Sequence, residues 1–193
     1  METMLSKARI ILASASPRRR ELMAYFGVPF TVIPSAAEEN AEGTAAEQAQ
    51  KLARDKGAEV FRRYPRYPVL SADTLVWLDD VALGKPRSRE DAARMLSVLS
   101  QRWHQVVTGV CLFTPDGMAR ERLVTTKVLF RKLGEKEILR YAATQEPMDK
   151  AGAYAMQGTG SMFIHRIDGS PSNVIGLPLC AVRDMLADAK IYT

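Results

Sequence analysis

The sequence predicts an α/β protein, because segments with the pattern of strands alternate with segments that have the pattern of helices. Its 193 residues are 47% hydrophobic. A chain of this kind can bury one sizeable core, either in a single domain or in two lobes that share a cleft. Residues 67–78 are apolar or small almost throughout, which is typical of a central strand buried on both faces. Two long strand-like runs, 103–113 and 118–130, are joined by Pro-Asp-Gly and indicate a hairpin.

The first element is a short strand that leads through a tight turn into a helix. Ile10 to Leu12 form the apolar strand, Ser16 is placed to cap the helix, and Pro17 takes its first position. We expect the helix to reach about Phe26. Its first turn also carries Arg18 to Arg20, although cations are unfavourable at this end of a helix. The arginines therefore indicate a strongly anionic ligand such as a polyphosphate, with a solvated basic turn as the alternative.

A second short strand is predicted over residues 30–33, and an acidic loop that contains Glu39 follows it. Glu39 is either a solvated loop residue or a carboxylate that helps to hold a divalent ion near a phosphate site. Residues 44–63 have the spacing of an amphipathic helix, and Lys56 falls on its apolar face. Two interpretations of this lysine stay open: an inward functional side chain, or one whose charged end reaches water at the edge of the face.

Asp73 interrupts the apolar strand at 67–78. A carboxylate there is costly unless it is hydrogen-bonded, ion-paired or bound to a metal, so we expect a functional role. Asp79-Asp80 predicts a turn into a return strand at 81–83. Lys85, fixed between Gly and Pro, is either an ordinary loop lysine or a residue that returns to the site of Asp73. Ser88 begins a predicted helix that runs to about residue 99.

The last third of the chain predicts four further segments. A helix is expected over 135–143 and a glycine-rich segment over 149–160, where the glycines suit turns or close approach of the backbone to a ligand. A strand is expected over 163–167, and the final helix ends near residue 189. Internal repeats, low-complexity segments and linkers are absent from the sequence, so we expect residues 1–193 to form one domain.

Composition restricts the classes of ligand. The chain has 27 basic and 22 acidic residues, a net charge of +5 and an isoelectric point near 9.3. This balance suits an anionic ligand. Aromatic residues make up 7% and are not interleaved with the basic clusters, so we expect no nucleic-acid partner.

The two cysteines, Cys111 and Cys180, have no neighbouring Cys or His at metal-binding spacing, and we expect both to be buried thiols in a reducing compartment. Met1 to Arg9 lack the apolar stretch and the cleavage site of a signal peptide. Apolar runs also stay well short of the roughly 18 residues of a membrane span. We therefore expect a cytoplasmic protein that does not enter a membrane.

Six motifs in fixed order resemble the Maf family of nucleoside triphosphate pyrophosphatases. They are LASASPRRREL, SADTLV, LGKPRS, HQVVTG, DKAGAYAMQGTG and NVIGLPL, and the resemblance runs from about residue 9 to residue 187. It implies a Maf/ITPase-like α/β fold: a single Maf-like domain with a mixed twisted sheet, flanking helices and two lobes around a central cleft. It also implies a homodimer. One departure is Gln101, which lies where many members have glycine and leaves the local turn geometry open.

The resemblance assigns roles to residues that stand out in the sequence. It implies a hydrolase that cleaves a nucleoside triphosphate to the monophosphate and pyrophosphate with Mg²⁺ or Mn²⁺, and Asp73 as the proton acceptor. It implies catalytic roles for Asp73, Glu39, Lys56 and Lys85, metal binding by Glu39 and Asp73, and substrate binding by Ser16, Arg18, Arg19, Thr74 and Gln157.

Thr74, directly after Asp73, and Gln157 in the late motif are similar to the branch that acts on dTTP and UTP. Modified pyrimidine nucleotides are compatible with the same match. The alternatives are the 7-methyl-GTP branch of the family and a regulator of septum formation that binds nucleotide without turnover.

Overall fold

The structure, a computed structural model, describes residues 9–192, which divide into two compact units. Unit 1 comprises residues 9–73, 108–124 and 176–192, and unit 2 comprises residues 74–107 and 125–175. Within the described residues the strands pair in the order β2-β1-β3-β5-β6-β7, with β4 also paired to β3. This mixed sheet with helices confirms the predicted fold class. The expectation that no targeting segment begins the chain concerns residues 1–8, which lie outside the described part.

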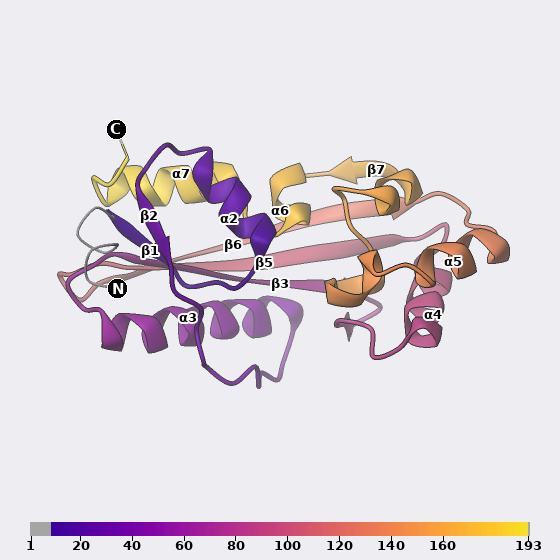
Figure 1. Cartoon of the computed structure of the whole chain (residues 1–193), viewed down its shortest axis with the longest axis horizontal. Helices are drawn as coiled ribbons and strands as arrows, with labels where there is room; N and C mark the ends of the chain where they lie inside the picture. Colours follow the sequence, from indigo (N-terminus) through magenta and orange to yellow (C-terminus); the bar gives the residue numbers. More distant parts are fainter. Residues whose placement is uncertain (1–8, 193) are drawn as a thin grey trace. The chain divides into compact units, whose positions relative to one another are not determined.

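The predicted strands and longer helices are all present, with small shifts at their ends (Figure 1). The strands are β1 (Ile10–Leu12), β2 (Phe30–Val32), β3 (Val69–Leu78), β4 (Val81–Leu83), β5 (Trp103–Phe113), β6 (Ala119–Phe130) and β7 (Ile164–Asp168). The helices are α2 (Pro17–Ala24), α3 (Ala45–Arg63), α4 (Arg89–Leu99), α5 (Glu135–Ala142), α6 (Pro171–Ile175) and α7 (Leu179–Asp188). Three short 3₁₀ turns, which the sequence pattern did not predict, are η1 (Glu146–Asp149), η2 (Ala151–Ala153) and η3 (Thr159–Phe163).

Unit 1 contains a parallel arrangement in which β1 pairs with both β2 and β3. All three residues of β1 are fully buried, as expected for a strand with neighbours on both sides. Helices α2 and α7 lie on one side of these strands and α3 on the other (Figure 1). Val60 of α3 packs against Ile11 and Val69, so α3 is anchored on the two strands that lead to the predicted site.

The helices of unit 1 begin where the sequence provides caps. The Ser16 hydroxyl accepts a hydrogen bond from the Arg19 N–H at 3.4 Å, and Pro17 occupies the first helical position of α2. Thr44 and Glu47 form a reciprocal capping box at the start of α3. The first motif is therefore a strand, a turn and a capped helix, as predicted.

Unit 2 begins with the second half of β3. Asp79 and Asp80 both have positive φ, and β3 and β4 pair directly on either side of them, which makes the predicted two-residue hairpin turn. Helices α4 and α5 pack against each other, and β7 is antiparallel to β6. The core of unit 2 includes an aromatic group whose rings meet edge to face: His104, Phe130, Tyr154, Phe163 and Tyr141.

The turn at Gln101, left open by the sequence, is resolved by the structure. Gln101 has φ of 60° and its N–H donates to the Arg131 carbonyl at 3.2 Å. The backbone therefore keeps the left-handed conformation that glycine adopts at lower cost, and Gln101 carries the strain of a side chain there.

The expectation for the cysteines is half wrong. Cys111 is fully buried in β5, and burial, with a smaller contribution from Glu121, raises the pKa of its thiol to about 12. Cys180 is exposed instead. It lies in the first turn of α7, whose buried face is formed by Val182, Met185 and Leu186, so Cys180 points to the opposite side of the helix. Within residues 9–192, none of the helices is both long and apolar enough to cross a bilayer.

Candidate functional site

The first part of the candidate site is the turn between β1 and α2. The Ser14 hydroxyl is buried and accepts a hydrogen bond from the Ser16 N–H at 3.2 Å. Arg19 donates from Nε to the Gly176 carbonyl at 2.8 Å and reaches the Ser14 hydroxyl from a terminal nitrogen at 3.5 Å. Arg19 is therefore held in place by contacts on both sides, and a fully solvated basic turn does not describe it.

The Arg19 guanidinium interacts electrostatically with the two predicted carboxylates, Asp73 and Glu39. Burial lowers the pKa of Arg19 below its ordinary value, while Asp73 and Glu39 act in the opposite direction and Arg18 reinforces the lowering. A guanidinium starts from so high a pKa that it stays protonated at neutral pH. The two predicted phosphate ligands, Arg18 and Arg19, thus share one neighbourhood with Asp73 and Glu39.

The second part of the site is a three-residue charged cluster formed by Glu39, Lys56 and Asp73. The Lys56 ammonium lies 2.6 Å from Asp73 Oδ1 and 2.7 Å from Glu39 Oε1. The side chains of Lys56 and Asp73 are only 14% and 10% exposed, whereas that of Glu39 is 64% exposed. The Lys56 side chain therefore points inward, while its functional role stays a prediction, and Asp73 has the ion pair that its burial requires.

Close packing of α3 on β3 positions Lys56 over Asp73. Ser71, two residues before Asp73, donates its hydroxyl to the Ala53 carbonyl of α3 at 2.6 Å. Gly57, directly after Lys56, lies so close to the strand that a Cβ there would be 2.5 Å from the Ser71 hydroxyl. Neither Ser71 nor Gly57 was singled out from the sequence. The available signal was a glycine within an otherwise regular amphipathic helix.

Helix α3 also fixes the segment that leads to Glu39. Glu59, one turn after Lys56, accepts hydrogen bonds from the Ser35 hydroxyl at 3.0 Å and the Ala36 N–H at 3.2 Å. Arg63 completes this arrangement by pairing with Glu59 at 3.1 Å. The two contacts of Glu59 with Ser35 and Ala36 could not be predicted from the sequence, because they join residues more than 20 positions apart.

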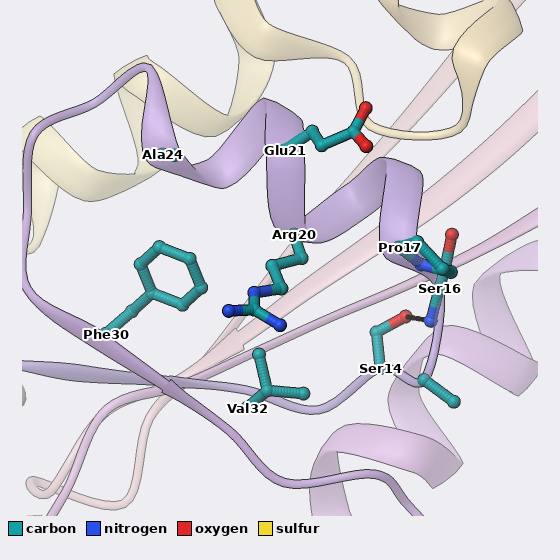
Figure 2. Close-up of a pocket in the computed structure, with 9 residues that line it drawn as sticks. Ser14, Ser16, Pro17, Arg20, Glu21, Ala24, Phe30 and Val32 are labelled. Atoms are coloured by element: carbon teal, nitrogen blue, oxygen red, sulfur yellow. Dashed lines mark hydrogen bonds between the residues drawn. The ribbon is translucent and has the colours of Figure 1, made fainter. Parts of the chain in front are cut away.

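A cavity of about 580 Å³ lies beside the start of α2 (Figure 2). Its wall combines an apolar part, with Phe30 and Val32 of β2, and a polar part that includes Ser16 and Arg20. Figure 2 shows Arg20 extending from α2 toward Val32 and Phe30. Of the three arginines in the motif, Arg20 thus lines this cavity, whereas Arg19 is bonded to Gly176.

The three remaining predicted residues, Thr74, Lys85 and Gln157, belong to unit 2. Thr74 is half-buried in β3 directly after Asp73, and Lys85 and Gln157 are exposed. The Gly84 carbonyl accepts a hydrogen bond from the Gly152 N–H at 3.1 Å, so the loop of Lys85 is tied to the glycine-rich segment.

The carboxylates of the charged cluster have the chemistry of a divalent cation site. Glu39 Oε1 and Asp73 Oδ1 both lie within 2.7 Å of a single atom, Lys56 Nζ, so the two side chains converge on one positive charge. Carboxylate oxygens are the protein ligands that Mg²⁺ and Mn²⁺ prefer, and Mg²⁺ usually takes only one or two of them together with substrate phosphates. Among residues 9–192 a group of three or more Asp, Glu, His or Cys side chains around one point is not found.

The protein is thus a mixed α/β protein. Its charged side chains, basic and acidic, lie together just beyond the point where the parallel strands β1 and β3 stop pairing. Residues 9–189 match the family of Maf-like proteins. The chain belongs to the Maf family, as the six motifs indicated.

Relatives extend over almost the full chain. It is 45% identical over 188 residues to a dTTP/UTP pyrophosphatase of Caldicellulosiruptor bescii, with 92% of this chain and 93% of that protein covered. A Bacillus velezensis protein of the same name is 44% identical over 186 residues, covering 95% and 97%. The solved structure of the Staphylococcus aureus Ham1 protein is 15% identical and covers 88% of this chain and 85% of its own, with a TM-score of 0.51. That likeness supports the fold alone.

Proposed function

We propose that the protein is a nucleoside triphosphate pyrophosphatase that hydrolyses dTTP and UTP to the nucleoside monophosphate and pyrophosphate. The observation that carries the proposal is the buried Asp73–Lys56 pair with Glu39 and Arg19 beside it. The relatives named dTTP/UTP pyrophosphatase, at 40–46% identity, support the choice of reaction.

The reaction assigns a different task to each charge. Arg18, Arg19 and Lys56 neutralise the phosphates, which bring about four negative charges to the site. Asp73 accepts a proton from water as the water oxygen bonds to the α-phosphorus. The bond from that phosphorus to the bridging oxygen breaks, and the electron pair leaves with pyrophosphate. Lys85 is proposed as a further phosphate contact.

A divalent cation, Mg²⁺ or Mn²⁺, is part of the proposal, with Glu39 and Asp73 as its protein ligands. When bound, the ion supplies charge neutralisation on the phosphate oxygens. The convergence of both carboxylates on Lys56 Nζ supports this choice, since the same oxygens accept a cation already. A homodimer and a cytoplasmic location are also proposed, on the family resemblance.

The test is pyrophosphate release from a panel of nucleotides that includes dTTP, UTP, GTP, ATP and 7-methyl-GTP. We expect turnover of dTTP and UTP that Asp73→Asn lowers on the order of 10²-fold or more, because the amide keeps the shape but cannot accept the proton. Asp55→Asn is the matched control, since Asp55 forms an exposed ion pair with Lys51 on the same helix, α3. A folded wild type that binds nucleotide and releases no pyrophosphate would be a binding regulator instead.

We propose that Gln157 and Thr74 select the base. The uracil edge presents two carbonyl acceptors and one N–H donor, and a glutamine amide offers one group of each kind. An unpaired polar group in a closed site costs roughly 1 to 3 kcal/mol, or about 10- to 150-fold in specificity. We expect UTP and dTTP to be preferred over GTP and ATP by about this factor, and Gln157→Ala to reduce the preference. Equal specificity constants for UTP and 7-methyl-GTP would contradict the assignment.

A further inference from the structure

A single carboxylate organises the glycine-rich segment that carries Gln157. Glu146, the first residue of η1, accepts hydrogen bonds from the Gly160 N–H at 2.9 Å and the Thr159 N–H at 3.1 Å. Its Oε1 also accepts from the Tyr141 hydroxyl at 2.9 Å. All of these groups lie in unit 2. Two backbone N–H groups and a phenol therefore converge on one side chain that the sequence motifs did not single out.

The backbone around Glu146 is shaped to let the carboxylate approach. Gly158 has φ of 136°, and a Cβ there would lie 2.7 Å from Glu146 Oε1. At Gly160 a Cβ would lie 2.7 Å from the Tyr141 hydroxyl. Packing explains why glycine occupies both positions. A side chain at either one would push the segment away from Glu146 and Tyr141.

The carboxylate is charged at neutral pH and is not interchangeable with a neutral group. Burial raises the pKa of Glu146, but the Gly160 and Thr159 N–H groups, the Tyr141 hydroxyl and Lys150 outweigh burial, so the pKa is lowered from its ordinary value. Hydrogen bonds from backbone N–H groups to a carboxylate are about twice as strong as neutral ones. The conformation of residues 158–160 thus depends on the ionised side chain.

We propose that Glu146 is a positioning residue for base selection, which fixes the backbone directly after Gln157 and so limits the positions that the Gln157 amide can reach. The inference rests on the proposed function and deepens it. Base discrimination requires a donor and an acceptor held near fixed points, and a mobile backbone would widen the range of positions that the Gln157 amide samples. Glu146 supplies that restraint through its hydrogen bonds with the Thr159 and Gly160 N–H groups.

The test compares specificity constants for UTP and GTP in Glu146→Gln. A neutral amide that must turn its NH₂ group toward one of the N–H donors loses a hydrogen bond, so we expect the UTP preference to fall about fivefold or more. Turnover of GTP should be unchanged. Asp116→Asn is the matched control, because Asp116 also accepts a backbone N–H, from Met118 at 3.2 Å, in the β5–β6 turn of unit 1.

A double-mutant cycle separates positioning from a structural role. In the Gln157→Ala background, Glu146→Gln should leave the UTP to GTP ratio unchanged, because the residue it positions is absent. Equal losses on both nucleotides, or a further fall of the ratio in the double variant, would overturn the inference. If Glu146→Gln fails to fold, Tyr141→Phe, which removes one of the three donors, replaces it, and an unchanged ratio there would likewise overturn the inference.

The outcome also distinguishes this inference from the proposed function. A wild-type protein that releases pyrophosphate from no triphosphate refutes the function itself. An active wild type whose base preference survives in Glu146→Gln refutes only the role of Glu146.

Discussion

His104 shows how a single buried residue couples stability to pH. Burial lowers the pKa of His104 to about 4, from an ordinary value of 6.5, and its Nε2 lies 2.9 Å from the Tyr154 hydroxyl. The unfolded chain therefore takes up a proton at a higher pH than the folded chain. Stability from this residue is fully present above pH 6.5 and is lost progressively as pH falls toward 4.

We expect the free energy of unfolding of wild type to fall by about 2 kcal/mol from roughly pH 7.5 to pH 5 through His104 alone. Urea unfolding of wild type and His104→Gln at both pH values isolates the contribution of His104 to the free energy of unfolding, since the other groups titrate in both proteins. The difference between the two proteins should shrink by that amount on acidification. Parallel pH dependence would show that His104 is not buried as a neutral ring.

Gln101 predicts a stabilising substitution. Its φ of 60° costs a non-glycine residue roughly 1 to 2 kcal/mol, part of which glycine loses again through the flexibility of the unfolded chain. Gln101→Gly should therefore raise the free energy of unfolding by about 0.5 to 1 kcal/mol. Gln101→Ala, which keeps the strain, should leave it unchanged. Equal stability of the two variants would argue against strain at this turn.

At the scale of an element, helix α3 holds together the charged residues of the candidate site that belong to unit 1. It carries Lys56, and through Glu59 it holds the segment before Glu39. Its position depends on two glycines, Gly57 within the helix and Gly109 in β5. The close approach of α3 to β3 and β5 is thus a requirement of the charged cluster as well as of the core.

Gly109→Ala tests this close approach. A Cβ at Gly109 would lie 2.3 Å from the Ala49 carbonyl oxygen, a backbone atom that cannot move without the helix. We expect a loss of about 3 kcal/mol or more in the free energy of unfolding, together with reduced turnover because Lys56 shifts. Gly134→Ala, with open space around the added Cβ, is the control. Near-normal urea unfolding of Gly109→Ala would contradict the described packing.

The local elements could be predicted from sequence because they depend on neighbours in the chain. The cap at Ser16, the turn at Asp79-Asp80 and the buried strand around Asp73 are of this kind. The roles of Glu146 and Gly109 could not be predicted, since each is defined by a backbone group from another element. The same holds for Cys180, whose exposure depends on which face of α7 is covered.

For the whole molecule, the net charge of +5 predicts how an anionic substrate is captured. Salt shortens the screening length from about 30 Å at 0.01 M to about 10 Å at 0.1 M. We therefore expect kcat/KM for UTP to fall several-fold over this range at constant free divalent cation, while kcat changes little. A specificity constant that is independent of ionic strength would show that the overall charge has no part in capture.

Unit 1 is assembled from three separate stretches of the chain, and Arg19 donates its Nε–H to a carbonyl 157 positions later. Gly176 is synthesised 157 residues after Arg19. Strand β1 and helix α2 can form from neighbouring residues, but Arg19 lacks this anchor until Gly176 has been synthesised. The contact that holds Arg19 is therefore established later during synthesis than the helix that carries it.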